Sequence, residues 1–295
     1  VEVQRLKDKL GDWSNASSEV EFQGAYGELI GKEGRGIQVI IEMVALTRLD
    51  CMTGSSSQMR QALVQALHHT KGRKAFGKYL IDQPLMRNVL ADLALESEAA
   101  IAFTLRVARA IDSASRDENE AAFARVATAI GKYWICKRTP PHVNEAQECF
   151  GGIGYVEETM MPRLYRQAPL NSIWEGSGNI QCLDVLRALS REPQTREALF
   201  AELGAAKSID RHYDTALAEL PALFNDTETL EFRSRAIVER TALLLQASVM
   251  LRSGQDEIAT AFCRSRLTGE HGLAFGTLGP DAPAGLLIER AMAEG

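Results

Sequence analysis

The sequence predicts a mainly α-helical protein built on a bundle of about four long helices. Residues 37–70 run without a proline before Gly72, and apolar side chains recur at helical spacing over residues 85–108 and again over 123–134. Pro140 and Pro141 should end the third helix near residue 138, and a fourth helix should span residues 177–189. We find no internal repeat that would indicate another architecture.

Two further regions should flank the bundle, which then occupies residues 32–190. Residues 1–31 are strand-like, because Val1, Val3, Val20 and Phe22 alternate with polar residues. They could form a surface hairpin, but we favour the remnant of a larger β domain, since so short a sheet is marginal alone. We therefore expect the natural chain to begin upstream of Val1. Residues 191–295 should form a helical tail with one helix over residues 229–251.

Composition excludes several classes of partner. The 295 residues are 45% hydrophobic and 24% charged, with a net charge of −6, which gives no sign of nucleic-acid binding. No apolar run approaches the roughly 20 residues that span a bilayer, so no membrane contact is predicted. The five cysteines are scattered without a C-x-x-C pair, so no metal site is predicted. Such dispersed thiols fit a reducing interior and predict a cytoplasmic location.

The most informative run is Asn-Ser-Ile-Trp-Glu-Gly-Ser-Gly-Asn-Ile-Gln at residues 171–181. Ser172 and Glu175 could simply form a capping box at a helix start. However, Gly176 and Gly178 would let a ligand approach the backbone closely. The apolar neighbours would also place the Glu175 carboxylate beside apolar surface, which suits a general base.

Two other runs have both a structural and a functional interpretation. The glycine-rich residues 149–155 form either a plain loop between helices or a loop against a cofactor; their spacing does not fit a dinucleotide-binding motif. Residues 72–77 form either a solvated basic helix end or a phosphate clamp made by Arg73 and Phe76. Arg48, inside the first helix, is expected to be ion-paired or to extend to solvent, and His68 and His69 should lie at the surface.

In this order, the motifs resemble those of the acyl-CoA dehydrogenase family. Residues 73–77 match its R-x-x-F-G motif, residues 150–152 its F-G-G loop, and residues 174–179 its Y/W-E-G-T/S-x-Q/N element. The resemblance covers the chain from its first residues to about Leu189. It implies the family's C-terminal four-helix bundle, here preceded by a β-domain remnant and followed by a helical tail.

The resemblance implies FAD as the cofactor. In the family, the residues matching Arg73 and Phe76 contact the pyrophosphate and adenine end of FAD from a neighbouring subunit, which implies a homo-oligomer, most simply a homotetramer. Those matching Phe150, Gly151, Gly152, Ser177 and Asn179 also touch FAD. Glu148 and Pro84 stand where many members have glutamines near the flavin.

The resemblance also implies an acyl-CoA substrate. Glu175 matches the catalytic base that removes the α-proton of the thioester, while a hydride passes from Cβ to the flavin. Arg48 matches an arginine near the base, and Gly176 and Arg187 match positions near the acyl-CoA. Some members carry the base one residue before that arginine; here this residue is Thr47, so Glu175 is the only matched base.

The fuller string over residues 161–187 is most similar to the AidB-like branch of the family, whose tail is associated with double-stranded DNA. The tail after Ser190 has 11 basic and 16 acidic side chains, a net charge of −5, which disfavours phosphate binding. We therefore expect only weak, salt-dependent duplex binding through a local arginine face made of Arg233, Arg235, Arg240, Arg264 and Arg266.

Two rival functions remain from the sequence. One is a DNA-associated flavoprotein of the alkylation response with vestigial dehydrogenase activity. The other is a helical assembly module without enzymatic activity, which predicts no bound flavin. A visible absorption spectrum of the purified protein separates the module from both flavoproteins.

Overall fold

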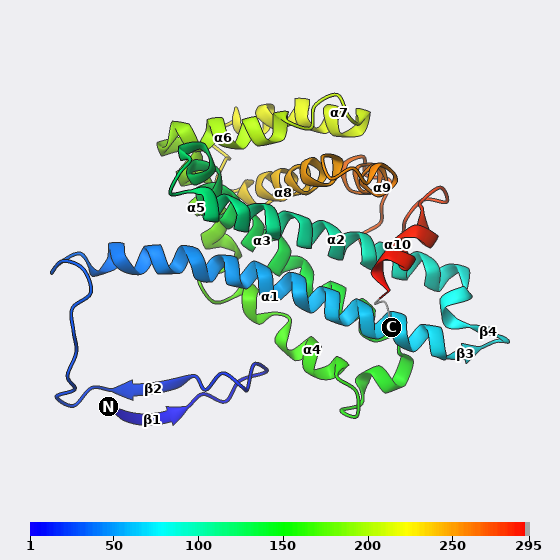
Figure 1. The fold of residues 1–295 in the computed structure, drawn as a ribbon, viewed down its shortest axis with the longest axis horizontal. Helices are drawn as coiled ribbons and strands as arrows, with labels where there is room; N and C mark the ends of the chain where they lie inside the picture. The colour runs from blue at the N-terminus through cyan, green and yellow to red at the C-terminus, as the bar shows by residue number, and fades with distance from the viewer. Residues whose placement is uncertain (293–295) are drawn as a thin grey trace.

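The computed structural model describes residues 1–292. Helices α1 (Gly36–Gly72), α2 (Pro84–Ser113) and α3 (Glu118–Glu148) pack against one another, and the shorter α5 (Gly178–Arg191) packs on α3 (Figure 1). Between α3 and α5 lie the 3-10 helices Gly151–Tyr155 and Leu170–Ser172 and the short α4 (Met161–Gln167). The predicted mainly α-helical class is therefore confirmed.

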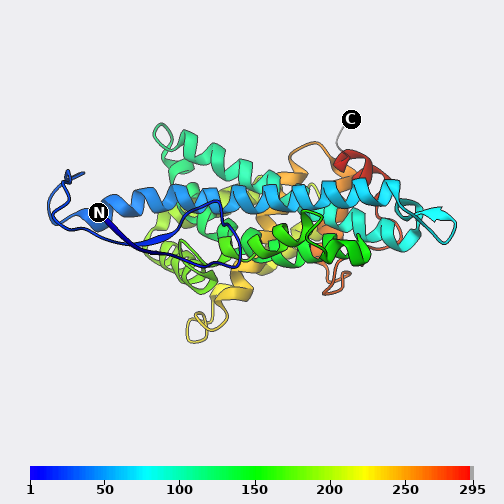
Figure 2. The same cartoon turned by 90° about the horizontal axis from the view of Figure 1, so that it is seen from below.

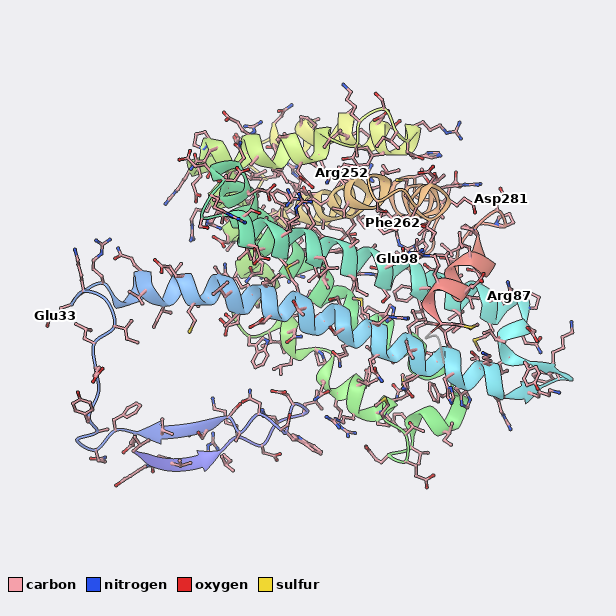
Figure 3. All side chains as sticks on the ribbon, viewed as in Figure 1. Glu33, Arg87, Glu98, Arg252, Phe262 and Asp281 are labelled. Carbon is pink, nitrogen blue, oxygen red and sulfur yellow. The ribbon has the colours of Figure 1, made fainter. Side chains whose placement is uncertain are left out.

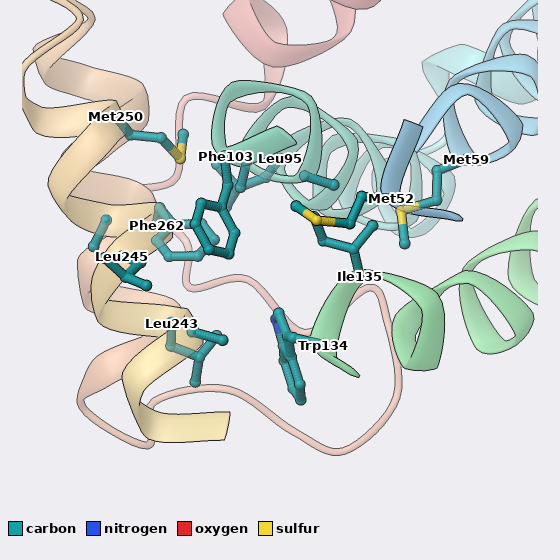
Figure 4. Close-up of a cluster of buried hydrophobic side chains, with 14 of the residues drawn as sticks. Met52, Met59, Leu95, Phe103, Trp134, Ile135, Leu243, Leu245, Met250 and Phe262 are labelled. Carbon is teal, nitrogen blue, oxygen red and sulfur yellow. The ribbon is translucent and has the colours of Figure 1, made fainter. Parts of the chain in front are cut away.

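Local signals and close packing explain the bundle. The Asp117 carboxylate caps α3 by accepting hydrogen bonds from the backbone N–H groups of Asn119 and Glu120. Gly131 permits close contact between α1 and α3, because a Cβ there would lie 2.3 Å from the terminal carbon of Met52. Met52, Phe103 and other apolar side chains fill the space between the helices (Figure 4).

The prediction that Pro140 and Pro141 end the third helix is wrong. Helix α3 continues through both residues to Glu148. Two interior prolines cost several kcal/mol, at about 3 kcal/mol each, but the segment beyond them is buried. His142 Nε2 lies 3.0 Å from the carbonyl oxygen of Leu93, and Val143 and Ala146 have no exposed surface. Tertiary packing thus outweighs the local cost of the prolines.

A two-stranded hairpin precedes the bundle. Strands β1 (Glu2–Leu6) and β2 (Ser18–Glu21) are antiparallel, with Val3 opposite Val20. Their apolar side chains remain exposed, at 61% for Val3 and 42% for Val20, as does Phe22 just after β2. A linker that includes Glu33 then crosses open space to α1, which runs along most of the length of the molecule (Figures 2 and 3).

A second hairpin extends from the far end of α1. Strands β3 (Lys74–Ala75) and β4 (Lys78–Tyr79) are joined by Phe76 and Gly77, whose φ angles are +52° and +80°. Two left-handed residues are what a tight two-residue turn requires. The side-chain amide of Gln83 donates to the Ala75 carbonyl at 3.1 Å and holds the hairpin to the 3-10 helix Leu80–Asp82 and the start of α2.

The tail is helical, as predicted. Its elements are α6 (Pro193–Gly204), α7 (Arg211–Glu219), the 3-10 helix Leu220–Phe224, α8 (Ser234–Leu251), α9 (Asp256–Leu267) and α10 (Ala284–Ala291). Helix α6 packs on α3, α8 on α2 and α3, and α10 on α2 (Figure 1). Across residues 1–292, every helix is too short or too polar to cross a lipid bilayer.

A buried ion network fastens the tail to the bundle. The guanidinium of Arg266 donates to Asp92 at 2.5 Å and to Glu96 at 3.1 Å, and His271 Nε2 lies 3.1 Å from Asp92. The Arg266 side chain is only 5% exposed. Burial opposes ionisation of Glu96, yet the guanidinium groups of Arg138 and Arg266 lower the pKa of Glu96 to about 2. The carboxylates and guanidiniums therefore stay charged, and each buried charge depends on its partners for compensation.

We expect Arg266→Met to reduce the free energy of unfolding by about 3–5 kcal/mol, because it leaves two buried carboxylates without a shared cation. Chemical denaturation at neutral pH measures the change. The matched control is Arg264→Met. Among the described residues Arg264 pairs with the exposed Glu270 and Asp281, so this change should leave stability close to that of the wild type. Equal stabilities of the two variants would contradict the role of the network.

Candidate active site

The candidate base, Glu175, lies in a strained turn just before α5. Its φ is +56° and that of Gly176 is +97°. The alternative interpretation as a capping box is wrong: the Ser172 hydroxyl donates to the Pro169 carbonyl, and α5 begins after Ser177. A non-glycine residue in this conformation costs free energy, so surrounding contacts must hold it.

Three side chains hold the turn through its carbonyl oxygens. The Lys132 ammonium donates to Trp174 O at 2.7 Å and to Gly176 O at 2.6 Å. The Gln181 amide donates to the Glu175 and Gly176 carbonyls at 3.1 and 3.0 Å. Arg48 Nε donates to the Glu175 carbonyl at 3.2 Å, so the base is fixed from α1, α3 and α5 together.

The sequence interpretation did not identify Lys132 or Gln181. Lys132 is 1% exposed, and burial lowers the pKa of its ammonium. The sequence feature that could have pointed to Lys132 is a lysine placed between apolar stretches of a predicted helix. Gly176 is needed beside them, because a Cβ there would lie 2.7 Å from Gln181 Nε2.

The Glu175 turn opens onto a cleft of about 700 Å³, here called the base cleft. Its α1 wall includes Thr47, Asp50, Cys51 and Gly54, and its other wall includes Leu170, Asn171, Trp174 and Glu175. Trp174 is fixed by a 2.9 Å hydrogen bond from its indole N–H to Asn171. The Glu175 carboxylate makes no hydrogen bond within residues 1–292, so it is available to a ligand.

A second cleft of about 450 Å³, here called the arginine cleft, lies between α1, α3 and α5. Arg48 and Arg125 both pair with Asp184, at 2.8 and 2.9 Å. Arg187 lines the same cleft and forms no ion pair inside the described part of the chain. Arg48 is therefore ion-paired, as expected, and also serves the Glu175 turn.

The remaining candidates lie at two separate places. Ser177 and Asn179 are exposed at the start of α5, close to Glu175. Arg73 and Phe76 lie on the β3–β4 hairpin, at the other end of α1. The 25 residues of helix from Arg48 to Arg73 separate the two places by roughly 37 Å along the axis. One chain therefore does not bring all candidates together.

The F-G-G loop belongs to the hairpin end. The Phe150 ring stacks on that of His69 with ring centroids 4.5 Å apart, so His69 is half-buried rather than fully at the surface as predicted. Burial, assisted by Arg73, lowers the pKa of His69. Gly151 has φ +64°, and a Cβ on Gly151 or Gly152 would meet nothing within 4 Å. The loop thus exposes bare backbone beside the hairpin.

Residues 34–190 match the sequence profile of the family described as "Acyl-CoA dehydrogenase, C-terminal domain". The chain belongs to the acyl-CoA dehydrogenase family. It is 45% identical over 273 residues to the AidB protein of Escherichia coli (strain K12), covering 92% of this chain and 50% of that protein. The chain therefore spans about half the length of that relative.

Solved structures of acyl-CoA dehydrogenases have the same fold. The Caenorhabditis elegans protein ACDH-11, in complex with C11-CoA, superimposes with a TM-score of 0.83 at 27% identity, over 94% of this chain and 51% of its own. An acyl-CoA dehydrogenase from Bacillus anthracis complexed with FAD gives a TM-score of 0.71 at 18% identity, over 89% and 53%. The family profile ends at residue 190, but the AidB and ACDH-11 similarities extend over most of the tail.

In this member of the family, Arg266 cannot belong to the predicted arginine face of the tail, although Arg235 is exposed and the Arg264 side chain is partly exposed. Arg266 is buried in the ion network. Arg240 donates to Leu267 O and Glu219, and Arg233 to the carbonyls of Leu223 and Asp226. The guanidinium groups thus satisfy acceptors of the protein itself, which periodicity and net charge could not show.

The cysteines and the potential metal ligands of residues 1–292 provide no further candidate site. The five cysteines are free and buried. Burial raises the pKa of the Cys51 thiol in the base cleft, so this thiol stays protonated at neutral pH. Within residues 1–292, no three His, Cys, Asp or Glu side chains are arranged to hold a metal ion.

We expect Lys132→Met to loosen the Glu175 turn more than it lowers the free energy of unfolding. The change removes the hydrogen bonds from Lys132 to the turn, but it also removes the cost of burying a charge, so the two effects partly cancel in global stability. A charge-assisted hydrogen bond contributes about 1.5–3 kcal/mol, so backbone amides of residues 174–178 should exchange with solvent at least about tenfold faster. Hydrogen-exchange mass spectrometry measures this. The control is Lys137→Met, because Lys137 is an exposed lysine of the same helix. Equal exchange rates in both variants would contradict the role of Lys132 in holding the Glu175 turn.

Proposed function

We propose that the protein oxidises a CoA thioester between its α and β carbons, with Glu175 as the base and FAD as the cofactor. The observation that carries this proposal is the Glu175 turn. Its carboxylate has no hydrogen-bond partner in residues 1–292, Glu175 lines the base cleft, and its backbone is held by Lys132, Gln181 and Arg48. Holding the base before substrate arrives reduces the cost of orienting it in the transition state.

The residues present fit FAD. Phe76 is 99% exposed on its hairpin and offers both ring faces to a planar group. Arg73 beside it is exposed and makes no ion pair inside the described residues. Gly151 and Gly152 present open backbone nearby, and Ser177 and Asn179 present polar groups at the other cluster. When bound, FAD would supply the ring that accepts the hydride.

Glu175 would take the α-proton of the thioester onto its carboxylate. The base cleft suits this step, because Leu170 and Trp174 give it apolar surface near Glu175. Gly176 would support this step through the turn itself, since a Cβ there would meet Gln181 and its left-handed backbone suits glycine. Arg48 acts on the reaction through the Glu175 carbonyl, which it binds.

The arginine cleft would receive the anionic part of the CoA substrate. Asp184 pairs with both Arg48 and Arg125, and Glu192 also pairs with Arg125 at 3.5 Å. Glu42 adds a carboxylate to the cleft wall. Arg187 forms no ion pair inside the described residues and is therefore a cation available to an anionic ligand. Ile41 and Leu46 contribute apolar surface to the same cleft. A phosphate-bearing ligand with an apolar arm matches this combination, and the related ACDH-11 was solved with C11-CoA.

Two subunits would build each cofactor site. The roughly 37 Å of helix between the Glu175 end and the Arg73 hairpin places the two clusters far apart in one chain. A symmetric homo-oligomer, with a homotetramer as the proposed form, would bring the hairpin of one subunit to the Glu175 end of another. No observation on the described residues favours DNA association, which stays a prediction of the resemblance.

We expect Glu175→Gln in the complete protein to lower acyl-CoA oxidation by at least about 100-fold, because the general base is lost, while FAD stays bound. Turnover with an artificial electron acceptor and the visible spectrum measure the two effects. Asp50 also lines the base cleft and supplies the rival assignment. Loss of turnover in Asp50→Asn but not in Glu175→Gln would show that the base is misassigned.

We expect mixed oligomers of Arg73→Ala and Glu175→Gln chains to regain activity that neither variant has alone. In a two-fold pair, one site would combine an intact Glu175 with the neighbour's intact Arg73, so up to about half of the sites would be restored. Co-expressed chains with different tags allow purification of the mixed form. Activity no higher than that of the separate variants would place Arg73 outside the neighbour's site.

A further inference from the structure

Helix α8 of the tail reaches the start of α5. Arg235, the second residue of α8, donates from Nε to the side-chain oxygen of Asn179 at 2.8 Å. Asn179 lies in the first turn of α5, four residues after Glu175. This contact joins a tail residue to one of the candidate cofactor residues, although the family profile ends before the tail, at residue 190.

The backbone on both sides is built for this contact. A Cβ on Gly178 would lie tightly at 3.3 Å from the Tyr133 ring and in ordinary contact at 3.5 Å from Nη2 of Arg235, so Arg235 lies directly against the start of α5. Behind Arg235, Ile237, Val238 and Thr241 are buried and hold α8 against the bundle. The guanidinium therefore projects from a fixed helix rather than from a loose segment.

The neighbouring arginine shows that the contact is specific to Arg235. Arg233 donates to Thr229, Leu223 and Asp226, all of which belong to the tail. Arg235 instead crosses to α5. Two arginines of one helix start thus have different partners, which provides a matched pair for experiment.

Donor chemistry decides how Asn179 is oriented. A guanidinium has only N–H donors, so the atom of Asn179 that faces Arg235 must be the amide oxygen. The amide nitrogen, with its two N–H donors, then faces away from Arg235. Without such a partner, the two ends of an asparagine amide can exchange places.

We propose that Arg235 is a positioning residue of the cofactor site: it fixes Asn179 so that the amide N–H groups are presented to an acceptor oxygen of the flavin nucleotide. This inference rests on the proposed function, because it takes the ligand at Asn179 to be the flavin nucleotide. It gives the tail a direct role in cofactor retention. Chains of this family without such a tail would need another way to orient the residue at this position.

The test measures FAD dissociation from the complete protein, followed by the rise in flavin fluorescence after dilution. A hydrogen bond of this kind contributes enough that Arg235→Met should release FAD about three- to tenfold faster. Arg235→Lys should recover part of the retention, because an ammonium can still donate to Asn179. Asn179→Asp keeps an acceptor for Arg235 but loses both N–H donors, so it should release FAD at least as fast as Arg235→Met.

Arg233→Met is the control, since it disturbs the tail without touching Asn179, and it should retain FAD as the wild type does. Unchanged dissociation in Arg235→Met, or wild-type retention in Asn179→Asp, would overturn the inference while leaving the proposed function intact. Equal acceleration in Arg233→Met would also overturn it, because the effect would then reflect general loosening of the tail. A wild-type protein that carries no flavin would overturn both.

Discussion

The candidate active site depends on one buried cation. The Lys132 ammonium lies inside the bundle, where burial disfavours its charge and lowers its pKa. The carbonyls of Trp174 and Gly176 compensate that cost, and in return the turn between them is held in a conformation that a free chain would rarely adopt. Because Lys132 projects from the central helix α3, the position of Glu175 is coupled to the packing of the whole bundle.

The length of α1 imposes the second constraint. Its middle supports the Glu175 turn through Arg48, and its end carries the hairpin with Arg73 and Phe76. A straight helix cannot bring these parts together, so in the proposed function a neighbouring chain must do so. Assembly and cofactor binding would then be linked, since loss of the oligomer would separate the two halves of each site.

Charge in the tail is used mainly within the molecule. The tail is acidic overall, yet its arginines bind carboxylates and carbonyls both of the bundle and of the tail itself. Arg266 binds two carboxylates of α2 together with Arg138 and His271, and Arg252 pairs with Glu202 of α6. These pairs make the tail a part of the folded core, and its contact with Asn179 extends that role to the candidate site.

Apolar periodicity in the sequence determined where the main helices lie, because the free energy of burying a helix face depends on residues three and four apart. Ordered motifs also determined the family and the identity of Glu175 as the candidate base. Only the tertiary structure decided that α3 passes through Pro140 and Pro141 and that Glu175 lies in a left-handed turn rather than in a capping box. It also showed which residues support the site, namely Lys132, Gln181, Asp184 and Arg235. These outcomes depend on contacts between residues far apart in the chain. A local sequence pattern does not report the energies of such contacts.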